Sequence, residues 1–330
     1  MSKPKLNIVC HLSDRTRALH DGTIRVEGVD ANFIDMHVAE TFFRMVKYRE
    51  FDASEMSLAA HTTLIGRGDS PFVGVPVFPS RIFRHSAMYI CAEKGIEKPE
   101  DLRGGRIGVP EYAMTASVWM RGVLHHEYGV APDEVTWVSG GQEKPGRKDR
   151  VDLDLPASIR LESLPEGQTL TRAVCEGGID ALFCPHVPSA FTAGDPRIRL
   201  LFPDSRSVEQ DYYRRTGLFH IMHTFVIRRD VYDTSPWLAQ SLFKAFTQAK
   251  DEIQKRLGDP NWLICTLPWS VAEQEETRKL MGDDFWPYGI EANRATLDTF
   301  CQYAFEQGLT ARRVAVEELF APGTAEAWIL

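Results

Sequence analysis

Residues 101–110 read DLRGGRIGVP, a turn with two glycines that leads into an apolar segment. Residues 99–105 predict a short helix and a turn, and residues 106–110 predict a strand. A helix is expected to follow over residues 116–128. Strands that alternate with helices in this way are typical of right-handed βαβ units in a mainly parallel sheet. The stretch therefore predicts an α/β protein.

The same alternation runs through the residues before this stretch. Strands are expected at residues 6–10, 32–36, 51–56, 72–78 and 87–91, and helices are expected to begin at Ser13 or Asp14, at Glu40 and at Ser57. In open α/β sheets, ligands bind beyond the carboxyl ends of the strands. A binding site is therefore expected in the loops that begin at His11, His37, Glu55 and Ser80.

Strands continue after residue 128, and after residue 227 the pattern changes to helices alone. Strands are expected at residues 136–139, 181–184 and 224–227, with a surface loop over residues 140–168. Helices are expected at residues 236–257, 270–281, 291–307 and 310–320. No strand follows them, so we expect this tail to pack back on the first sheet.

The composition of the 330 residues is that of a folded protein, with 43% hydrophobic residues and a formal charge of −8. It excludes disorder and fibrous repeats, and no apolar run reaches the ~18 residues of a membrane helix. The acidic balance argues against a nucleic-acid partner. The beginning of the chain has no secretory signal, and the six cysteines make no CxxC pair, so we expect a cytoplasmic, reduced protein.

Several features together resemble the type II periplasmic-binding-protein fold: the βαβα start, residues 101–110, residues 176–182 (EGGIDAL), a return strand and the C-terminal helices. Members of that fold have two lobes with the ligand in the cleft between them. The resemblance implies a first lobe of residues 1–86 and 222–330, with the C-terminal helices packed on it. It implies a second lobe of residues 87–221 and hinges near residues 84–88 and 219–224.

A narrower resemblance is to the 4,5-dihydroxyphthalate decarboxylases, an enzyme branch of this fold. The stretches that carry it are residues 14–19 (DRTRAL), 40–45 (ETFFRM), 51–58 (FDASEMSL) and 285–290 (FWPYGI), with residues 78–85 and 221–224. The chain departs from the family pattern at His11-Leu12-Ser13. The resemblance implies a carboxy-lyase that converts an aromatic ortho-dicarboxylate to protocatechuate and carbon dioxide without an organic cofactor, as part of phthalate degradation. We also expect a homo-oligomer.

Two other functions remain open from the sequence. A solute-binding receptor for a small aromatic carboxylate needs the same fold, and fold alone does not separate it from the enzyme. A metal-assisted lyase or hydrolase would use histidines. His11, His61 and His186 fit no short ligand motif, and residues 125–127 (HHE) are expected to face solvent at a helix end, so no metal site is assigned.

Decarboxylation of an electron-rich ring is a protonation problem. A hydroxyl para to the departing carboxylate pushes electrons toward the carbon that bears it, and a general acid protonates that carbon. The site therefore needs an acid, a base for the phenol and a cation for the retained carboxylate.

Arginine matches a carboxylate with two parallel hydrogen bonds, so Arg81 and Arg84 are predicted to bind substrate. The alternative for either is a salt bridge between the lobes or on the surface. Ser57 and Thr115 are expected at the starts of helices, with Ser117 close behind, where unpaired N–H groups suit an anion. Capping of its own helix is the alternative for Thr115.

Histidine titrates near neutral pH, and His85 and His223 are predicted to transfer protons. Glu55 is the alternative acid or base, with a capping or buried ion-pair role as its structural alternative. His186 and His220 are predicted to complete the binding site. His186 lies at the end of a strand expected in the second lobe, and His220 lies in one of the two segments expected to connect the lobes.

Overall fold

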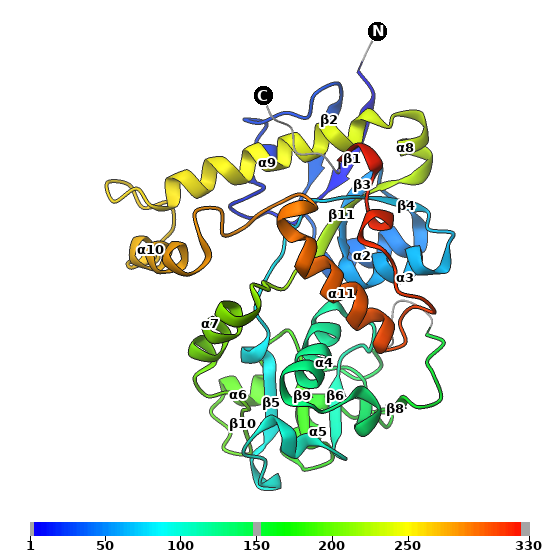
Figure 1. Cartoon of the computed structure of the whole chain (residues 1–330), viewed down its shortest axis with the longest axis vertical. Coiled ribbons are helices and arrows are strands. Elements are labelled where there is room, and N and C mark those ends of the chain that lie inside the picture. Colours follow the sequence, from blue (N-terminus) through cyan, green and yellow to red (C-terminus); the bar gives the residue numbers. More distant parts are fainter. Residues whose placement is uncertain (1–2, 148–152, 325–330) are drawn as a thin grey trace.

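The computed structural model describes residues 3–147 and 153–324, which form two lobes, each built on its own sheet (Figure 1). The first sheet has the order β2-β1-β3-β11-β4. Its strands are β1 (Lys5–Val9), β2 (Asp30–Ile34), β3 (Ala53–Ser57), β4 (Phe72–Val75) and β11 (His223–Arg228). β1 pairs in parallel with β2 and β3, whereas β11 runs antiparallel between β3 and β4. A strand from late in the chain therefore completes the sheet begun at the N-terminus.

The second sheet has the order β10-β5-β9-β6-β7-β8. Its strands are β5 (Met88–Cys91), β6 (Arg106–Val109), β7 (Thr136–Ser139), β8 (Arg160–Ser163), β9 (Ala181–Phe183) and β10 (Ile198–Leu200). The four strands from β9 to β8 are parallel, and β5 and β10 are antiparallel to their neighbours. The two mixed sheets confirm the α/β class, with more antiparallel pairing than a mainly parallel sheet implies.

The α-helices surround both sheets. They are α1 (Arg17–His20), α2 (Val38–Tyr48), α3 (Leu58–Arg67), α4 (Thr115–Tyr128), α5 (Leu170–Cys175), α6 (Ser189–Thr192), α7 (Ser205–Thr216), α8 (Arg229–Thr234), α9 (Trp237–Leu257), α10 (Ser270–Met281) and α11 (Arg294–Glu306). No helix among these described residues is long and apolar enough to cross a membrane.

Three expectations about elements were wrong. The helix expected over residues 310–320 is irregular except for a 3-10 turn at Val316–Leu319. The surface loop expected over residues 140–168 contains β8, and residues 148–152 of it lie outside the described residues. The first helix begins at Arg17 rather than at Ser13 or Asp14, because Ser13 and Thr16 bond to each other in a preceding turn.

Two segments that connect the sheets run side by side. Residues Arg81 and Ile221 form an antiparallel bridge, the Ile82 amide donates to the His220 carbonyl at 3.1 Å, and the Met222 amide donates to the Ser80 carbonyl at 2.9 Å. These bonds fix the two crossings to each other at the floor between the lobes. The lobe bounds and the hinge positions expected from the sequence stay predictions, as does the homo-oligomer.

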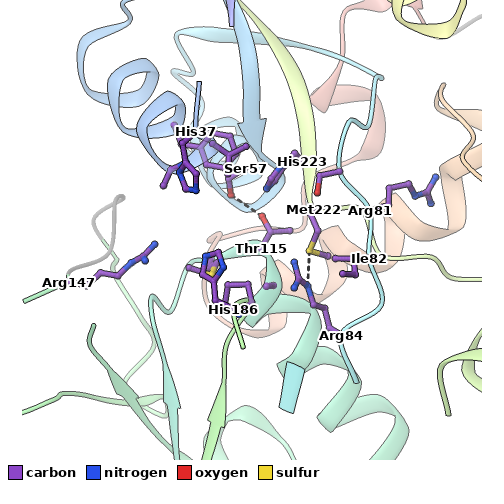
Figure 2. A pocket seen from close by; sticks show the side chains of 17 residues that line it. His37, Ser57, Arg81, Ile82, Arg84, Thr115, Arg147, His186, Met222 and His223 are labelled. Carbon is purple, nitrogen blue, oxygen red and sulfur yellow. Dashed lines mark hydrogen bonds between the residues drawn. The ribbon is translucent and has the colours of Figure 1, made fainter. Parts of the chain in front are cut away.

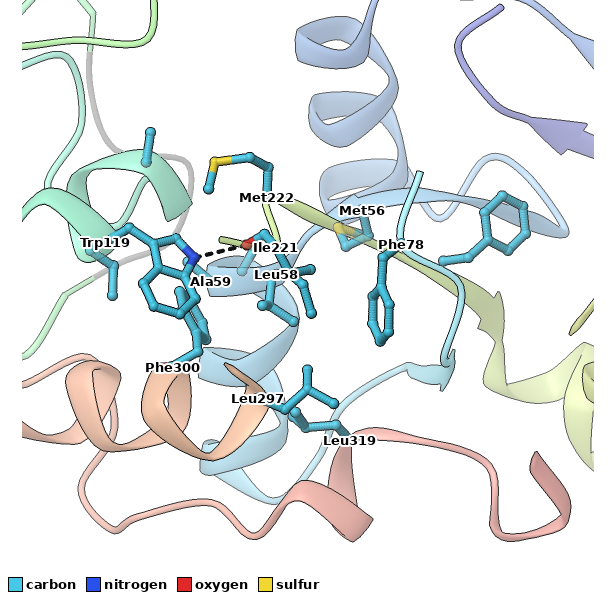
Figure 3. Close-up of a cluster of buried hydrophobic side chains, with 14 of the residues drawn as sticks. Met56, Leu58, Ala59, Phe78, Trp119, Ile221, Met222, Leu297, Phe300 and Leu319 are labelled. Atoms are coloured by element: carbon cyan, nitrogen blue, oxygen red, sulfur yellow. Dashed lines mark hydrogen bonds between the residues drawn. The ribbon is translucent and has the colours of Figure 1, made fainter. Parts of the chain in front are cut away.

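A buried cluster joins the second lobe, a crossing and the C-terminal tail (Figure 3). The Trp119 indole of α4 donates to the Ile221 carbonyl at 2.9 Å, and its ring lies 5.4 Å from that of Phe300 in α11. α11 also packs on α3, while α9 packs on α1 and β4 of the first lobe. The tail therefore covers the first lobe, as expected, and α11 reaches the second lobe as well.

Candidate active site

A cleft of about 400 Å³ lies between the lobes, a volume that suits one substituted aromatic ring. Its lining includes six of the predicted residues, Ser57, Arg81, Arg84, Thr115, His186 and His223. It also includes three side chains that were not assigned a role from the sequence, His37, Arg147 and Met222 (Figure 2). The predicted strand ends and crossings therefore meet at one place.

Glu55 and His223 form a hydrogen-bonded pair on the wall of the first lobe. β3 and β11 are antiparallel neighbours, and their register brings the two side chains to the same end of the sheet. The Nδ1 atom of His223 lies 2.6 Å from Oε1 of Glu55, whose other oxygen accepts the His11 amide at 3.2 Å. Because an ionised carboxylate can only accept, Nδ1 of His223 carries a proton and Nε2 is the atom left for the cleft.

The carboxyl of Glu55 is held in its charged form. Burial by itself would raise the pKa of Glu55, but the hydrogen bond and charge of His223, together with the His11 amide, outweigh burial and lower that pKa. Glu55 is only 2% exposed and does not line the cleft. Its geometry is therefore that of a residue that orients His223, rather than of an acid that reaches a ligand.

Arg84 is a buried cation that faces the cleft. It is 9% exposed, and its Nε atom lies 3.2 Å from the Met222 sulfur. Among the described residues, no carboxylate forms an ion pair with its guanidinium. Burial lowers the pKa of Arg84 to about 10, so the group is still charged at neutral pH. A buried charge without a counterion is costly, which makes this side chain a candidate for binding an anion.

Arg81 has the opposite orientation, away from the cleft (Figure 2). Its guanidinium donates to the Phe219 carbonyl at 2.8 Å, to Asn293 Oδ1 at 2.7 Å and to the Pro287 carbonyl at 3.1 Å. These bonds tie the crossing to the segment before α11. The charged end of Arg81 is thus bonded within the protein, and of the two arginines only Arg84 presents its guanidinium to the cleft.

The N-termini of three helices point at the cleft. His37 is the N-cap of α2 and Ser57 the N-cap of α3, as expected for Ser57. Thr115 is the first residue of α4 and does not cap its own helix. Its hydroxyl instead lies 2.9 Å from that of Ser57 and accepts the Ala59 amide of α3 at 3.0 Å. Helix N-termini carry partial positive charge, so this hydroxyl bridge between the lobes lies where an anion is favoured.

Besides Glu55, three predicted residues lie outside the cleft lining. His220 stacks on Trp119 at 4.4 Å, and the His85 ring lies 5.2 Å from that of Tyr212 in the same buried aromatic cluster. Burial lowers the pKa of His85 to about 4 and that of His220 well below its ordinary value, so both are neutral at neutral pH. Ser117 is fully buried within α4. The structure therefore does not place these three side chains on the surface of the cleft.

Signals in the sequence pointed only in part to two of the three unassigned side chains, His37 and Arg147. His37 follows β2 at a strand end that was expected to carry a site, and its Nδ1 accepts the Ala39 amide at 3.3 Å. Arg147 lies in the loop that was expected on the surface, and it donates to Glu111 at 2.7 Å. His186 lies beside them, and its pKa is lowered by burial and by the charges of Arg147, His37 and Arg84.

The described residues of the cleft do not support the alternative of a metal-assisted lyase or hydrolase. His11 pairs with Asp35, and the His61 ring is buried against the Leu319 carbonyl at 2.7 Å. Within residues 3–147 and 153–324, the one group of three His, Cys, Asp or Glu side chains placed to hold an ion is His125, His126 and Glu306, at the far end of α4. The three histidines considered from the sequence are therefore not brought together.

Comparisons with solved structures show the fold. The periplasmic aliphatic sulphonate binding protein of Escherichia coli superposes with a TM-score of 0.55 at 12% identity, over 98% of this chain and 99% of that one. The alkanesulfonate-binding protein of Xanthomonas axonopodis pv. citri superposes with a TM-score of 0.53 at 13% identity, over 97% and 99% of the two chains. The two-lobed periplasmic-binding-protein fold expected from the sequence is confirmed.

Comparisons with characterised sequences show the family, although no family model matches the chain. A 4,5-dihydroxyphthalate decarboxylase of Comamonas testosteroni is 40% identical over 328 residues, which are 99% of each chain. One of Pseudomonas putida is 42% identical over 214 residues, which are 65% of this chain and 83% of the relative. The resemblance seen in the short motifs thus extends along the whole sequence, and the chain belongs to the 4,5-dihydroxyphthalate decarboxylase family.

Proposed function

We propose that this protein converts 4,5-dihydroxyphthalate to protocatechuate and carbon dioxide in the cleft between its lobes. The observation that carries the proposal is the opposition of two groups across that cleft. His223 is held by a buried carboxylate, and Arg84 is buried with no carboxylate partner in the described part of the chain. The reaction needs one proton donor and one anion site, and these two side chains supply them. The relatives' name supports the same reaction and substrate.

The proton goes to the ring carbon that loses its carboxylate. As the para hydroxyl loses its proton, electron density moves through the ring to that carbon, which takes a proton from Nε2 of His223. The carbon–carbon bond to the carboxylate then breaks, its electron pair restores the aromatic phenolate, and carbon dioxide leaves. The phenolate then takes back the proton that the hydroxyl had lost. One proton is consumed in each turnover. Glu55 is a positioning residue, because it holds the imidazole orientation and stabilises the protonated ring before transfer.

The retained carboxylate pairs with Arg84. A guanidinium offers two parallel donors to one carboxylate and so fixes the plane of the ring. The Ser57 and Thr115 hydroxyls lie at helix N-termini on facing lobes and complete the anion site. The departing carboxylate needs no comparable partner, since a group held equally in the ground and transition states gains nothing in rate.

The hydroxyl end of the ring faces the histidines on the other side of the cleft. Figure 2 shows His37 and His186 on one side and Arg84 on the other. Since Nδ1 of His37 accepts the Ala39 amide, its neutral ring carries the proton on Nε2 and can donate to a phenol oxygen. The pKa of His186 is lowered, so it is neutral at pH 7 and available as the base for the para hydroxyl.

The reaction belongs to the cytoplasm in this proposal. All six cysteines are free thiols, and five of them are buried. Free thiols are usual in a reducing compartment.

The test is incubation of the purified protein with 4,5-dihydroxyphthalate. We expect the ultraviolet spectrum to change to that of protocatechuate, with release of one equivalent of carbon dioxide. Treatment of the sample with EDTA beforehand separates this mechanism from a metal-assisted one, because the proposed steps use side chains alone and the rate should not change. Protein that binds the acid tightly and leaves it intact would be a receptor, and the proposal would be wrong.

A further inference from the structure

A second cluster of ligand-type side chains lies outside the cleft, where the C-terminal ends of α4 and α11 meet. Nε2 of His126 is 2.7 Å from Oε2 of Glu306, and Nδ1 of His125 is 3.8 Å from the same oxygen. The three ligand atoms all lie within 4.8 Å of one another. Each of the three side chains is 25–38% exposed, so an ion in solution can reach them.

These distances are close to those of a metal site. Zinc–nitrogen and zinc–oxygen bonds of about 2.0–2.2 Å place the ligand atoms of a tetrahedral site roughly 3.3 Å apart. The observed separations lie on both sides of that value, so small side-chain rotations would bring all three atoms to one ion. Two imidazoles and one carboxylate are a donor set that suits Zn²⁺, and the fourth position is left for water.

The surroundings hold the cluster in place. Oε1 of Glu306 accepts the Gln302 amide at 2.7 Å, and the His126 ring stacks on Tyr303 at 4.8 Å. The next residue along, Gln307, is buried and bonds Nε of Arg121 at 2.7 Å and the Val118 carbonyl at 2.9 Å. The two helices are therefore fixed to each other beside the cluster, and the ligands need little ordering to bind an ion.

The electrostatics of this place favour a cation. His125 and His126 lie in the last turn of α4, which ends at Tyr128, and Glu306 is the last residue of α11. The C-terminal ends of helices carry partial negative charge, and here two such ends meet. The carboxylate adds a full negative charge, and the pKa of Glu306 is lowered: burial raises it, but the hydrogen bonds from His126 and Gln302 and the charges of the two histidines outweigh burial.

We propose that His125, His126 and Glu306 bind a divalent transition-metal ion of the Zn²⁺ type, which clamps the second lobe to the C-terminal helix α11. The alternative is a plain ion pair between protonated His126 and Glu306 that binds no metal. The proposed site is structural and lies apart from the cleft, so it does not depend on the proposed reaction.

The experiment measures Zn²⁺ binding to the full-length protein after treatment with a chelator and its removal. Isothermal titration should give one equivalent that is lost in Glu306→Gln and in His126→Gln. It should be kept in His20→Gln, a histidine outside the cluster, and in His186→Gln, a histidine of the cleft. Substitution with Co²⁺ should give visible bands without the near-ultraviolet absorption of a cobalt–thiolate bond, which excludes the cysteines as ligands.

A graded variant tests the geometry further. Gln302→Ala leaves all three ligands in place but releases Oε1 of Glu306, and loss of such an outer partner typically weakens metal affinity by about 10–100-fold. Zn²⁺ should also raise the melting temperature of the wild type and not that of Glu306→Gln. Binding that is absent in the wild type, or unchanged in both Glu306→Gln and His126→Gln, would overturn the proposal and leave the ion pair as the explanation.

Discussion

Arg81 and Arg84 lie three residues apart on one crossing segment, yet their guanidinium groups point in opposite directions. Arg81 is bonded to two carbonyls and to Asn293, whereas Arg84 faces the cleft beside Met222. One arginine therefore holds the fold together and the other is available to a ligand, and a pair of matched substitutions separates these two roles.

Arg84→Met should raise KM for 4,5-dihydroxyphthalate by roughly 10–100-fold, because hydrogen bonds to charged groups contribute about 1.5–3 kcal/mol. Arg81→Met should leave KM near the wild-type value and lower the free energy of unfolding by about 2–3 kcal/mol. Steady-state kinetics and urea unfolding measure the two effects. A wild-type KM for Arg84→Met in folded protein would remove Arg84 from the binding site.

His223→Gln should lower kcat by about 10²–10⁴-fold, the range for loss of a general acid, while KM changes little. Glutamine can still hydrogen-bond to Glu55, so the strand pairing of β3 and β11 should be kept. His85→Gln is the matched variant on the other histidine predicted to transfer protons. Equal losses of kcat in the two variants would contradict the assignment of proton transfer to His223.

Glu55→Gln should lower kcat by about 10²–10⁴-fold without contact with the substrate, because an amide permits the wrong tautomer of His223. The readout that separates orientation from simple structure is the nitrogen NMR spectrum of the His223 ring. In the wild type the neutral ring should carry its proton on Nδ1, and in Glu55→Gln a fraction should carry it on Nε2. An unchanged tautomer with reduced kcat would mean that Glu55 acts in another way.

His85→Phe should keep catalytic activity within about twofold and weaken the dependence of stability on pH. The folded protein holds the pKa of His85 at about 4 through burial, against an ordinary value of 6.5. Between these values the unfolded chain binds a proton that the folded chain does not, so the free energy of unfolding falls as the pH drops from 6.5 toward 4. The slope is at most about 1.4 kcal/mol per pH unit for one such group.

Phenylalanine cannot take up that proton, so urea unfolding of His85→Phe at several pH values between 7 and 5 should show a smaller decline than the wild type. A slope equal to the wild type in His85→Phe would show that His85 does not contribute to acid sensitivity.

Much of the fold follows from the sequence because its strands are buried and apolar. β1, β3 and β6 were predicted within three residues at each end. β1 and β6 are rich in apolar residues, whereas β3 contains Ser54, Glu55 and Ser57 and was predicted from the alternation of strands and helices around it. β8 and β10 were missed because they are short edge strands, and the sequence of β8, RLES, is mostly exposed. Such strands form only because a neighbour offers unpaired backbone groups, which a local pattern does not reveal.

The loops that form the site were predicted from the sequence, but the contacts and directions of the side chains in it were predicted less well. Both members of the Glu55–His223 pair could be named, because each lies at an expected strand end. Their contact depends on β11 entering between β3 and β4 with a particular register. The direction of Arg81 depends on Asn293, 212 residues away, and no spacing rule carries that information.

The position of β11 has a consequence for how the chain is made. The strand that carries His223 lies between β3 and β4, but it follows every strand of the second sheet in the sequence. A ribosome therefore releases the second lobe in full while the place of β11 between β3 and the edge strand β4 is still empty. Since domains generally fold as they emerge, the pair of Glu55 and His223 is assembled late in biosynthesis, and a nascent chain that stops before residue 223 lacks the proposed proton donor.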